Sequence, residues 1–335
     1  MLLRDTNALR VLHFGGYWRG PNDVVHQMVL GLASAGVLVL EYNTDRHPEV
    51  LDTEGRPYDR GRFGPVWLRF ELLEPLVHHY RPGLIVCNAG GLSFRPEAAR
   101  RLREQCCLLG IALSDPDVFE PATSRIARNF DVYLTNAEDC LARYRALGVN
   151  AHLWPPGTYE GFYRPVAPKP EYQCDVLIFG NGHPDRVEPV RALLQGFNTR
   201  VYGEGWDAHG IQSRGLVFGE ESLHVLNSAR LTVVFCRTSG GHPIVKPYLF
   251  DFPAAGALVA TNYLAGVERY FAYDEEIIGF HDPEDLVRKV RYYLDHPEEA
   301  DRIRSAGRRR VLREHTWKHV WPRILALAKN AIPQP

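Results

Sequence analysis

The stretch Cys174–Leu194, CDVLIFGNGHPDRVEPVRALL, decides the fold of this chain. It begins as an apolar strand, turns through Gly180-Asn181-Gly182, and continues in a pattern that predicts a helix through Phe197. The same order stands near the N-terminus, where the apolar run Arg10–Phe14 precedes a glycine-rich turn. The predicted helix that follows, Val24–Gly36, has one apolar face and ends at a glycine. Two copies of strand, glycine turn and helix predict two α/β units.

Further apolar runs of strand length alternate with helical patterns along the chain. They are VLVLEYN at 37–43, GLIVCNAGG at 83–91, CCLLGIALSD at 106–115, FDVYLTN at 130–136, TRVYG at 199–203, RLTVVFC at 230–236, ALVAT at 257–261 and EEIIGF at 275–280. Nearly continuous apolar strands that alternate with helices are typical of parallel sheets covered on both faces. The predicted fold class is therefore α/β, with two Rossmann-like, doubly wound domains.

The alternation stops at Arg164–Pro170, which contains three prolines. Such a run favours an extended connector, and we place the domain boundary there. The predicted domains are residues 1–165, 171–315 and a C-terminal helix at 316–335. Because open sheets of this kind bind ligands at the carboxyl ends of their strands, we expect a ligand in a cleft that the two domains face.

Composition excludes several classes of protein. The 335 residues carry a formal net charge of -1, so bulk attraction to nucleic acid or to an anionic membrane is not expected. The six cysteines lack the spacing of zinc ligands and are expected to be free thiols in a reducing cytoplasm. The start of the chain is too polar for a signal peptide, and no apolar run approaches the roughly 20 residues that span a bilayer. We therefore expect a soluble, cytoplasmic protein without an integral membrane segment.

The segment His242–Asn262, HPIVKPYLFDFPAAGALVATN, is unusual for a core segment. Lys246 and Asp251 lie between aromatic and apolar residues, just before a glycine and a predicted strand. An isolated cation and an isolated carboxylate at such a place indicate a binding site.

Four segments, in this order, resemble a GT-B glycosyltransferase of the group 1 type, nearest to the branch that includes spore-maturation CgeB-like proteins. They are YLTNAEDCLARYRALGVNAHLWPPGTYEGFYRP at 133–165, VLIFGNGHPDRVEPVRALL at 176–194, VYGEGW at 201–206, and LFDFPAAGALVATN at 249–262 with its helical sequel at 286–317. The resemblance covers most of residues 125–320. In addition, HTWKHVWP at 315–322 resembles the kinked C-terminal helix that crosses back onto the N-terminal domain in this fold.

The resemblance implies a role for Asp251. The family usually has Glu at this position, five residues before the glycine, where it accepts hydrogen bonds from the ribose hydroxyls of the donor. A carboxylate suits a vicinal diol because it accepts two charge-assisted hydrogen bonds. Retaining relatives often carry a second Glu eight positions earlier, where this chain has Pro243. The alternative for Asp251 is a carboxylate that caps or stabilises a helix N-terminus.

Three cations are predicted to meet the donor diphosphate. Arg186 stands where the family carries a Lys or Arg after the glycine loop, and Lys246 follows the turn Ser239-Gly240-Gly241. Arg237 closes a strand at its carboxyl end, the edge where such sheets bind ligands. The alternatives are solvated side chains for Arg186 and Lys246 and a structural ion pair for Arg237.

The glycine turns are the second predicted element of the donor site. Gly15 and Gly16 in the first turn, and Gly180 and Gly182 in the second, allow backbone N–H groups to approach phosphate oxygens at a helix start. Asn181 occupies a position where many relatives have Arg. Trp206 either stacks on the base of the nucleotide or packs in the core.

In the N-terminal half, LSDPDVFEP at 113–121 resembles a segment that relatives place on the acceptor side of the cleft. Asp115, with Asp117 nearby, is the candidate base or acceptor-orienting group; the alternative is a plain Asp-Pro turn. His13 is expected to be a hydrogen-bonded core histidine.

These observations predict a glycosyltransferase that moves a sugar from a nucleotide-diphosphate sugar to an unknown acceptor, which is a small molecule, a glycan or a protein. The resemblance implies retention of configuration. The cations leave no need for a divalent metal, and no cofactor is expected because the nucleotide sugar is a substrate. The alternatives are a nucleotide-sugar epimerase on the same fold and a non-catalytic nucleotide-binding protein. A dinucleotide-dependent dehydrogenase is disfavoured, because no G-x-G-x-x-G follows either first strand.

Overall fold

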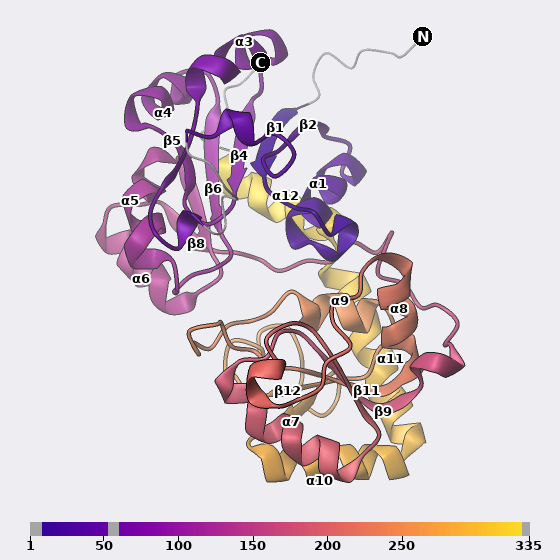
Figure 1. Cartoon of the computed structure of the whole chain (residues 1–335). Helices are drawn as coiled ribbons and strands as arrows, with labels where there is room; N and C mark the ends of the chain where they lie inside the picture. The colour runs from indigo at the N-terminus through magenta and orange to yellow at the C-terminus, as the bar shows by residue number, and fades with distance from the viewer. Residues whose placement is uncertain (1–8, 53–59, 330–335) are drawn as a thin grey trace. The chain divides into compact units, whose positions relative to one another are not determined.

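The computed structural model describes residues 9–52 and 60–329. The chain divides into two compact units, which Figure 1 shows from indigo at the N-terminus to yellow at the C-terminus. The first unit comprises Met1–Trp18, Asp23–Pro155 and Trp317–Pro335, and the second comprises Arg19–Asn22 and Pro156–Thr316. Each unit is built on its own parallel sheet, as the alternating pattern predicts.

The sheet of the first unit has six parallel strands in the order β2-β1-β4-β6-β7-β8. Their bounds are β1 (Arg10–Gly15), β2 (Leu38–Asn43), β4 (Leu84–Asn88), β6 (Cys107–Ala112), β7 (Val132–Thr135) and β8 (Ala151–Leu153). The helices of this unit are α1 (Val24–Ser34), α3 (Phe70–Tyr80), α4 (Pro96–Arg103), α5 (Ser124–Ile126), α6 (Glu138–Ala146) and α12 (Trp317–Ala328). The order of strands reverses direction at β1, so the carboxyl ends of β1 and β4 lie at a switch point where such sheets bind ligands.

The sheet of the second unit has five parallel strands in the order β10-β9-β11-β12-β13. They are β9 (Cys174–Phe179), β10 (Thr199–Tyr202), β11 (Ala229–Val234), β12 (Val259–Asn262) and β13 (Ile278–Phe280). Its helices are α7 (Pro184–Gly196), α8 (Gly219–Ser228), α9 (Tyr248–Ala254), α10 (Pro283–Asp295) and α11 (Pro297–Glu314). Here the switch point lies between β9 and β11, and the loops that follow these two strands carry most of the predicted donor residues.

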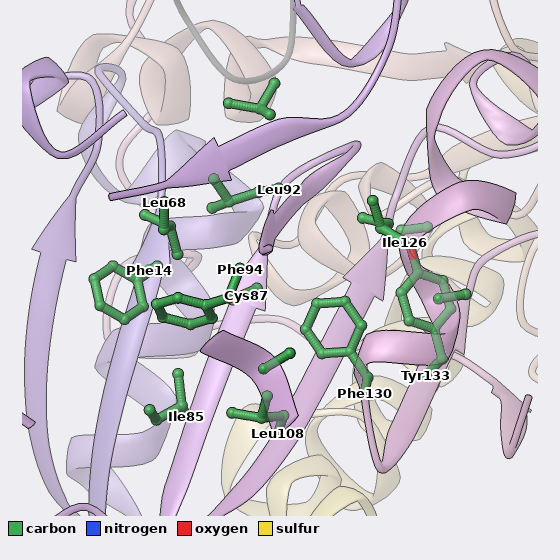
Figure 2. Packing of buried hydrophobic residues seen from close by; sticks show 14 of the residues in the cluster. Phe14, Leu68, Ile85, Cys87, Leu92, Phe94, Leu108, Ile126, Phe130 and Tyr133 are labelled. Carbon is green, nitrogen blue, oxygen red and sulfur yellow. The ribbon is translucent and has the colours of Figure 1, made fainter. Parts of the chain in front are cut away.

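Figure 2 shows how side chains from neighbouring strands of the first unit fill one layer. Phe14 of β1, Ile85 of β4 and Leu108 of β6 are fully buried in the same cluster. Phe94 meets the ring of Phe14 edge-on, with the centroids 5.8 Å apart. Alternate residues of a strand point to one face of the sheet, so these contacts account for the apolar spacing of the strands.

Phe94 belongs to a two-stranded sheet that the sequence analysis did not predict. Its strands, β3 (Val66–Leu68) and β5 (Leu92–Phe94), are parallel and contain three residues each. Strands this short carry too little periodicity to be recognised from the sequence. Their burial against the main sheet stabilises them instead.

The C-terminal helix α12 packs against α1 within the first unit, where Figure 1 shows the yellow helix beside the indigo one. The Trp321 indole N–H donates to the Met28 carbonyl oxygen (2.8 Å), and both side chains are fully buried. At Gly31 of α1 a Cβ atom would lie 2.2 Å from the Cβ of Trp317. The close approach of the two helices therefore requires a glycine at position 31.

The chain leaves the first unit at Pro155, ten residues before the predicted boundary at 165, and returns to it at Trp317. The segment that follows is held by the second unit: the Thr158 N–H donates to the His315 carbonyl oxygen (2.9 Å), and Phe162 and Tyr163 join its core. The prolines mark an extended segment, but the change of unit comes earlier because these aromatic side chains are buried.

Candidate functional site

The loops after β9 and β10 interlock at the carboxyl edge of the second sheet. The Gly180 N–H donates to the Tyr202 carbonyl (2.9 Å), and the Gly182 N–H donates to the Glu204 carbonyl (2.7 Å). The Glu204 N–H in turn donates to the Asn181 side-chain oxygen (3.1 Å). The Gly180 N–H could therefore donate to a phosphate oxygen only if its hydrogen bond to the Tyr202 carbonyl were broken.

Glycine is required at two places where these loops meet. Gly180 and Gly203 have φ angles of 140° and 131°, which side chains rarely adopt. A Cβ on Gly203 would lie 2.2 Å from the carbonyl oxygen of Gly180. The glycines of GNG and GEG therefore let two backbones approach each other, and not only a ligand.

Trp206 lies beneath the interlocked loops. Its side chain is 0% exposed, and its indole N–H donates to the Gly180 carbonyl oxygen (2.8 Å). Of the two interpretations of Trp206, the structure supports core packing, because a fully buried ring offers no face to a nucleotide base. Trp206 supports the glycine loop from below.

Arg186 lies in the first turn of α7 and is only 7% exposed. Its guanidinium donates to two backbone carbonyl oxygens, that of Asn181 (2.6 Å) and that of Arg237 (3.3 Å). It also lies over the ring of Phe235, 5.8 Å from the centroid. Burial lowers the pKa of this guanidinium. Arg186 therefore differs from the solvated arginine that was the alternative. Its two terminal nitrogens each have a carbonyl acceptor, whereas its buried Nε has no hydrogen-bond partner among the described residues.

The loop after β11 forms a tight turn that includes Ser239, Gly240 and Gly241. The Arg237 guanidinium donates to the Gly241 carbonyl (3.0 Å), and the Ile244 N–H donates to the Cys236 carbonyl (3.0 Å). Ser239 and Gly240 are exposed at the tip, and Arg237 is also exposed. Lys246 follows the turn, is partly buried and precedes α9. The structure thus brings Arg237, Lys246 and the turn to one edge of the sheet.

Asp251 lies in the first turn of α9 and is 1% exposed. Its Oδ1 accepts a hydrogen bond from the Thr158 hydroxyl (2.7 Å). The carboxylate therefore ties the segment after Pro155 to α9. Contact with a ribose would require α9 or Thr158 to move, so the observed geometry favours a structural role for this group.

A recess with aromatic walls lies beside the glycine loop in the second unit. It is lined by Phe179 and Gly180 after β9, Tyr202 and Gly203 after β10, Leu216–Phe218, Tyr248 of α9, and Arg19 and Asn22. The Arg19 guanidinium lies over the Phe218 ring, 5.4 Å from its centroid. Asn22 accepts from the Gly219 N–H (2.7 Å) and donates to the Ser222 hydroxyl (2.9 Å).

Sequence reasoning did not find this recess. Arg19 and Asn22 belong to the glycine-rich turn near the N-terminus, and nothing in their spacing indicates that they join the second unit. Tyr248 could have pointed to the recess, because it follows Lys246 and Pro247 in the segment His242–Asn262 that the sequence analysis associates with binding.

A larger cavity, of about 630 Å³, lies at the opposite, amino-terminal edge of the same sheet. Its arginines are engaged with carboxylates: Arg230 with Asp175 (3.6 Å) and Arg304 with Asp301. Since parallel sheets bind ligands at the carboxyl ends of their strands, this cavity is not the candidate donor site.

In the first unit, the predicted glycines pack closely against their neighbours. A Cβ on Gly15 would lie 2.7 Å from a methyl group of Val25 and 2.8 Å from the carbonyl oxygen of Asn88. A Cβ on Gly16 would lie 2.9 Å from a carboxylate oxygen of Asp45. As in the second unit, the first glycine is needed for packing within the protein.

Asp115 does not have the position of an acceptor-side base. It is 0% exposed, and its carboxylate accepts hydrogen bonds from the hydroxyls of Thr123 (2.9 Å), Thr135 (2.7 Å) and Tyr144 (2.8 Å). Burial raises its pKa, against the opposing effect of these donors. The structure corrects the prediction: Asp115 anchors the segment after β6, while Asp117 is only partly buried.

His13 is buried, as expected, but not hydrogen-bonded. Neither ring nitrogen has a partner, and burial lowers the pKa of the imidazole to about 3. A buried neutral imidazole without partners costs free energy. We have no physical account of why the chain retains it.

Residues 9–52 and 60–329 contain no group of three or more His, Cys, Asp or Glu side chains placed to hold a metal ion. In the same ranges, no helix has the length and apolar character needed to cross a membrane.

Comparison with known proteins gives these features a context. Residues 184–326 match a family model described as glycosyl transferase-like. The chain has the GT-B fold, and its match to the glycosyl transferase-like family lies in the second unit and the helix that follows it. It is 21% identical over 242 residues to the spore protein CgeB of Bacillus subtilis, covering 64% of this chain and 73% of CgeB.

Two solved structures show the same fold over almost the whole of this chain. The sucrose-phosphate synthase from Thermosynechococcus elongatus has a TM-score of 0.66 and 16% identity, covering 96% of this chain and 98% of its own. Anabaena HepE in complex with UDP-glucose has a TM-score of 0.64 and 9% identity, covering 96% of this chain and 100% of its own. At these identities the similarity establishes the fold alone.

Proposed function

We propose that this glycosyltransferase moves a sugar from a nucleotide-diphosphate sugar, with UDP as the first nucleotide to test, to an acceptor hydroxyl. The observation that carries the proposal is the aromatic recess beside the interlocked glycine loops. It lies at the carboxyl edge of the second sheet, largely within the part of the chain that matches the glycosyl transferase-like family. The fold shared with HepE, whose structure contains UDP-glucose, supports the choice of UDP.

We propose that the recess receives an edge of the nucleotide base. Its volume is about 30 Å³, too small for a whole ring, so the aromatic side chains that line it would have to move when the base binds. Phe218 and Tyr248 supply aromatic surface, and Arg19 supplies hydrogen-bond donors to a ring that carries carbonyl oxygens. Uracil presents two carbonyl oxygens, so an arginine at this place favours it over adenine, which presents none. Backbone groups of the glycine loop line the same recess and would fix the orientation of the ring.

The diphosphate would then lie toward the turn after β11. Arg237 and Lys246, together with the exposed tip Ser239-Gly240, provide positive charge and polar groups at the neighbouring strand end. When the bond between sugar and diphosphate breaks, negative charge develops on the diphosphate, and fixed cations stabilise it without reorganisation. We propose that these cations replace a divalent metal, and that the sugar is transferred with retention, as the family resemblance implies.

A screen tests the proposal. The purified protein is incubated with UDP-, GDP- and ADP-sugars, with and without candidate acceptors, and released nucleotide and sugar are measured. Hydrolysis that one acceptor class stimulates supports transfer. Interconversion of sugars without an acceptor would instead support an epimerase, and binding without turnover would support a nucleotide-binding protein. Activity should survive EDTA; loss on chelation and recovery with Mg²⁺ would overturn the metal-independent mechanism.

The recess is tested by UDP binding in the Tyr248→Ala variant. We expect affinity for UDP to fall about tenfold, since stacking on an aromatic side chain contributes about 1–3 kcal/mol. Tyr292→Ala is the matched control, because Tyr292 is an exposed tyrosine on α10 of the same unit and does not line the recess. Equal affinities in the two variants would remove the recess from the donor site.

A further inference from the structure

We propose that Arg186 is a positioning residue: its guanidinium holds the loop after β9 and the loop after β11 at a fixed spacing, and it acts on the donor through them. The sequence had suggested a direct contact with the diphosphate. This inference rests on the proposed function only in that these two loops bind the donor.

The position of Arg186 in α7 accounts for its reach. The helix begins at Pro184, and a side chain in its first turn points back toward the helix N-terminus. The loop that precedes the helix lies there, so the guanidinium reaches the Asn181 carbonyl (2.6 Å). Its other terminal nitrogen reaches the Arg237 carbonyl (3.3 Å), 51 positions along the chain. One side chain therefore links the ends of two adjacent strands at the switch point of the sheet.

The chemistry of this link requires arginine. A guanidinium is planar and donates in two directions at once, whereas an ammonium is a point charge on a flexible stem. The Phe235 ring lies 5.8 Å from the guanidinium carbon and limits its rotation. Both acceptors are backbone carbonyls and not carboxylates, so the positive charge is retained beside the loops. Arg237, by contrast, is exposed and better placed to touch a ligand directly.

The first test does not depend on any substrate. In the ligand-free protein, Arg186→Lys keeps the charge but cannot bridge both carbonyls. We expect amide hydrogen exchange to rise about tenfold in both loops, Gly180–Gly182 and Arg237–Gly241, since the loss of one charged hydrogen bond is enough for such a change. Arg191→Lys on the same helix is the matched control: Arg191 also donates to a backbone carbonyl, that of His209 (2.8 Å), but it does not reach either loop.

The second test uses UDP. We expect Arg186→Lys to weaken UDP binding about tenfold, almost as much as Arg186→Gln, because geometry and not charge is lost. If Arg186→Lys binds UDP like the unmodified protein while Arg186→Gln does not, Arg186 acts as a point charge on the diphosphate and the inference is wrong. Phe235→Leu leaves every charge in place and should loosen both loops to a smaller extent, which provides a test if the Arg186 variants do not fold.

The two tests separate the inference from the proposed function. If the unmodified protein binds no nucleotide, the proposed function fails, yet the exchange rates of the two loops still decide whether Arg186 links them. Unchanged exchange in both loops of Arg186→Lys would overturn the inference whatever the ligand proves to be.

Discussion

The two glycine loops of this chain occupy equivalent places, each after the first strand of a unit, yet they are packed differently. In the first unit, the three atoms nearest to a Cβ on Gly16 would all belong to the carboxylate group of Asp45, the end of a side chain that can turn away. In the second unit, a Cβ on Gly182 would meet the Trp206 ring at 2.8 Å and the backbone of Gly205 at 2.9 Å. One sequence pattern therefore produces a loop next to a movable neighbour in the first unit and a loop fixed by backbone in the second.

The aspartates that the sequence analysis placed in the site extend the comparison. Asp115 in the first unit accepts from three hydroxyl groups, while Asp251 in the second accepts from the Thr158 hydroxyl. Both are almost completely buried. A buried carboxylate near the carboxyl edge of a parallel sheet can therefore stabilise the fold without binding a ligand. Its hydrogen-bond partners distinguish the two roles.

The largest effect is expected for Asp115→Ala. The change leaves the hydroxyls of Thr123, Thr135 and Tyr144 without their acceptor, and each buried hydroxyl that stays unpaired costs about 1–3 kcal/mol. The Tyr144 hydroxyl lies 2.6 Å from the Thr123 hydroxyl and can donate its single proton there once Asp115 is gone, so part of the loss is recovered. We expect the first unit to lose about 4 kcal/mol, measured by hydrogen exchange of the amides in β6 and β7.

Glu120→Ala is the control for this variant. Glu120 lies in the same segment but is exposed and pairs with Arg143, so its loss should change stability by less than about 0.5 kcal/mol. The conservative change Asp115→Asn separates the two roles of the residue. A turnover reduced a hundredfold in Asp115→Asn, with stability intact, would restore Asp115 as a catalytic base.

An intermediate effect is expected for the link between Asp251 and Thr158. Asp251→Ala and Thr158→Val should each destabilise the second unit by about 2 kcal/mol, and the double variant by clearly less than the sum, since both remove the same hydrogen bond. Asp251→Asn removes the charge but keeps an amide oxygen that can still accept from the Thr158 hydroxyl. We expect UDP affinity to change less than threefold, because the carboxylate is 1% exposed. A tenfold loss of UDP affinity in Asp251→Asn but not in Thr158→Val would support the ribose contact that the family implies.

Much of the fold could be predicted from the sequence because the central strands of both sheets are buried on both faces. Such strands are continuous apolar runs, as in β4 and β9, and the glycine turns mark where they end. The strands β3, β5 and β8 were not predicted, since three residues show no period and depend on their partners. Likewise, the change of unit at Pro155 depends on where Phe162 and Tyr163 are buried.

Less of the site could be predicted. The sequence located the loops after β9 and β11, because glycines and a strand end are local features. It could not show that the Arg186 guanidinium would donate hydrogen bonds to two backbone carbonyl oxygens, since the second belongs to Arg237, 51 positions away. Nor could it show that the Trp206 indole lies beneath Gly180, or that Arg19 joins the second unit. Each of these facts depends on tertiary packing and not on local spacing.

The smallest expected effect tests the glycine loops themselves. Gly16→Ala and Gly182→Ala each add one methyl group to the second glycine of their loop. At position 182 the methyl group would overlap backbone and a buried indole, neither of which can move far, and overpacking of this kind costs about 1–3 kcal/mol. At position 16 the Asp45 carboxylate can rotate, so we expect a change within about 0.5 kcal/mol. Because a two-unit chain need not unfold in one step, each variant is followed by hydrogen exchange in its own unit. Equal losses in the two variants would mean that Asp45 is held as firmly as Trp206, and that the two loops are alike after all.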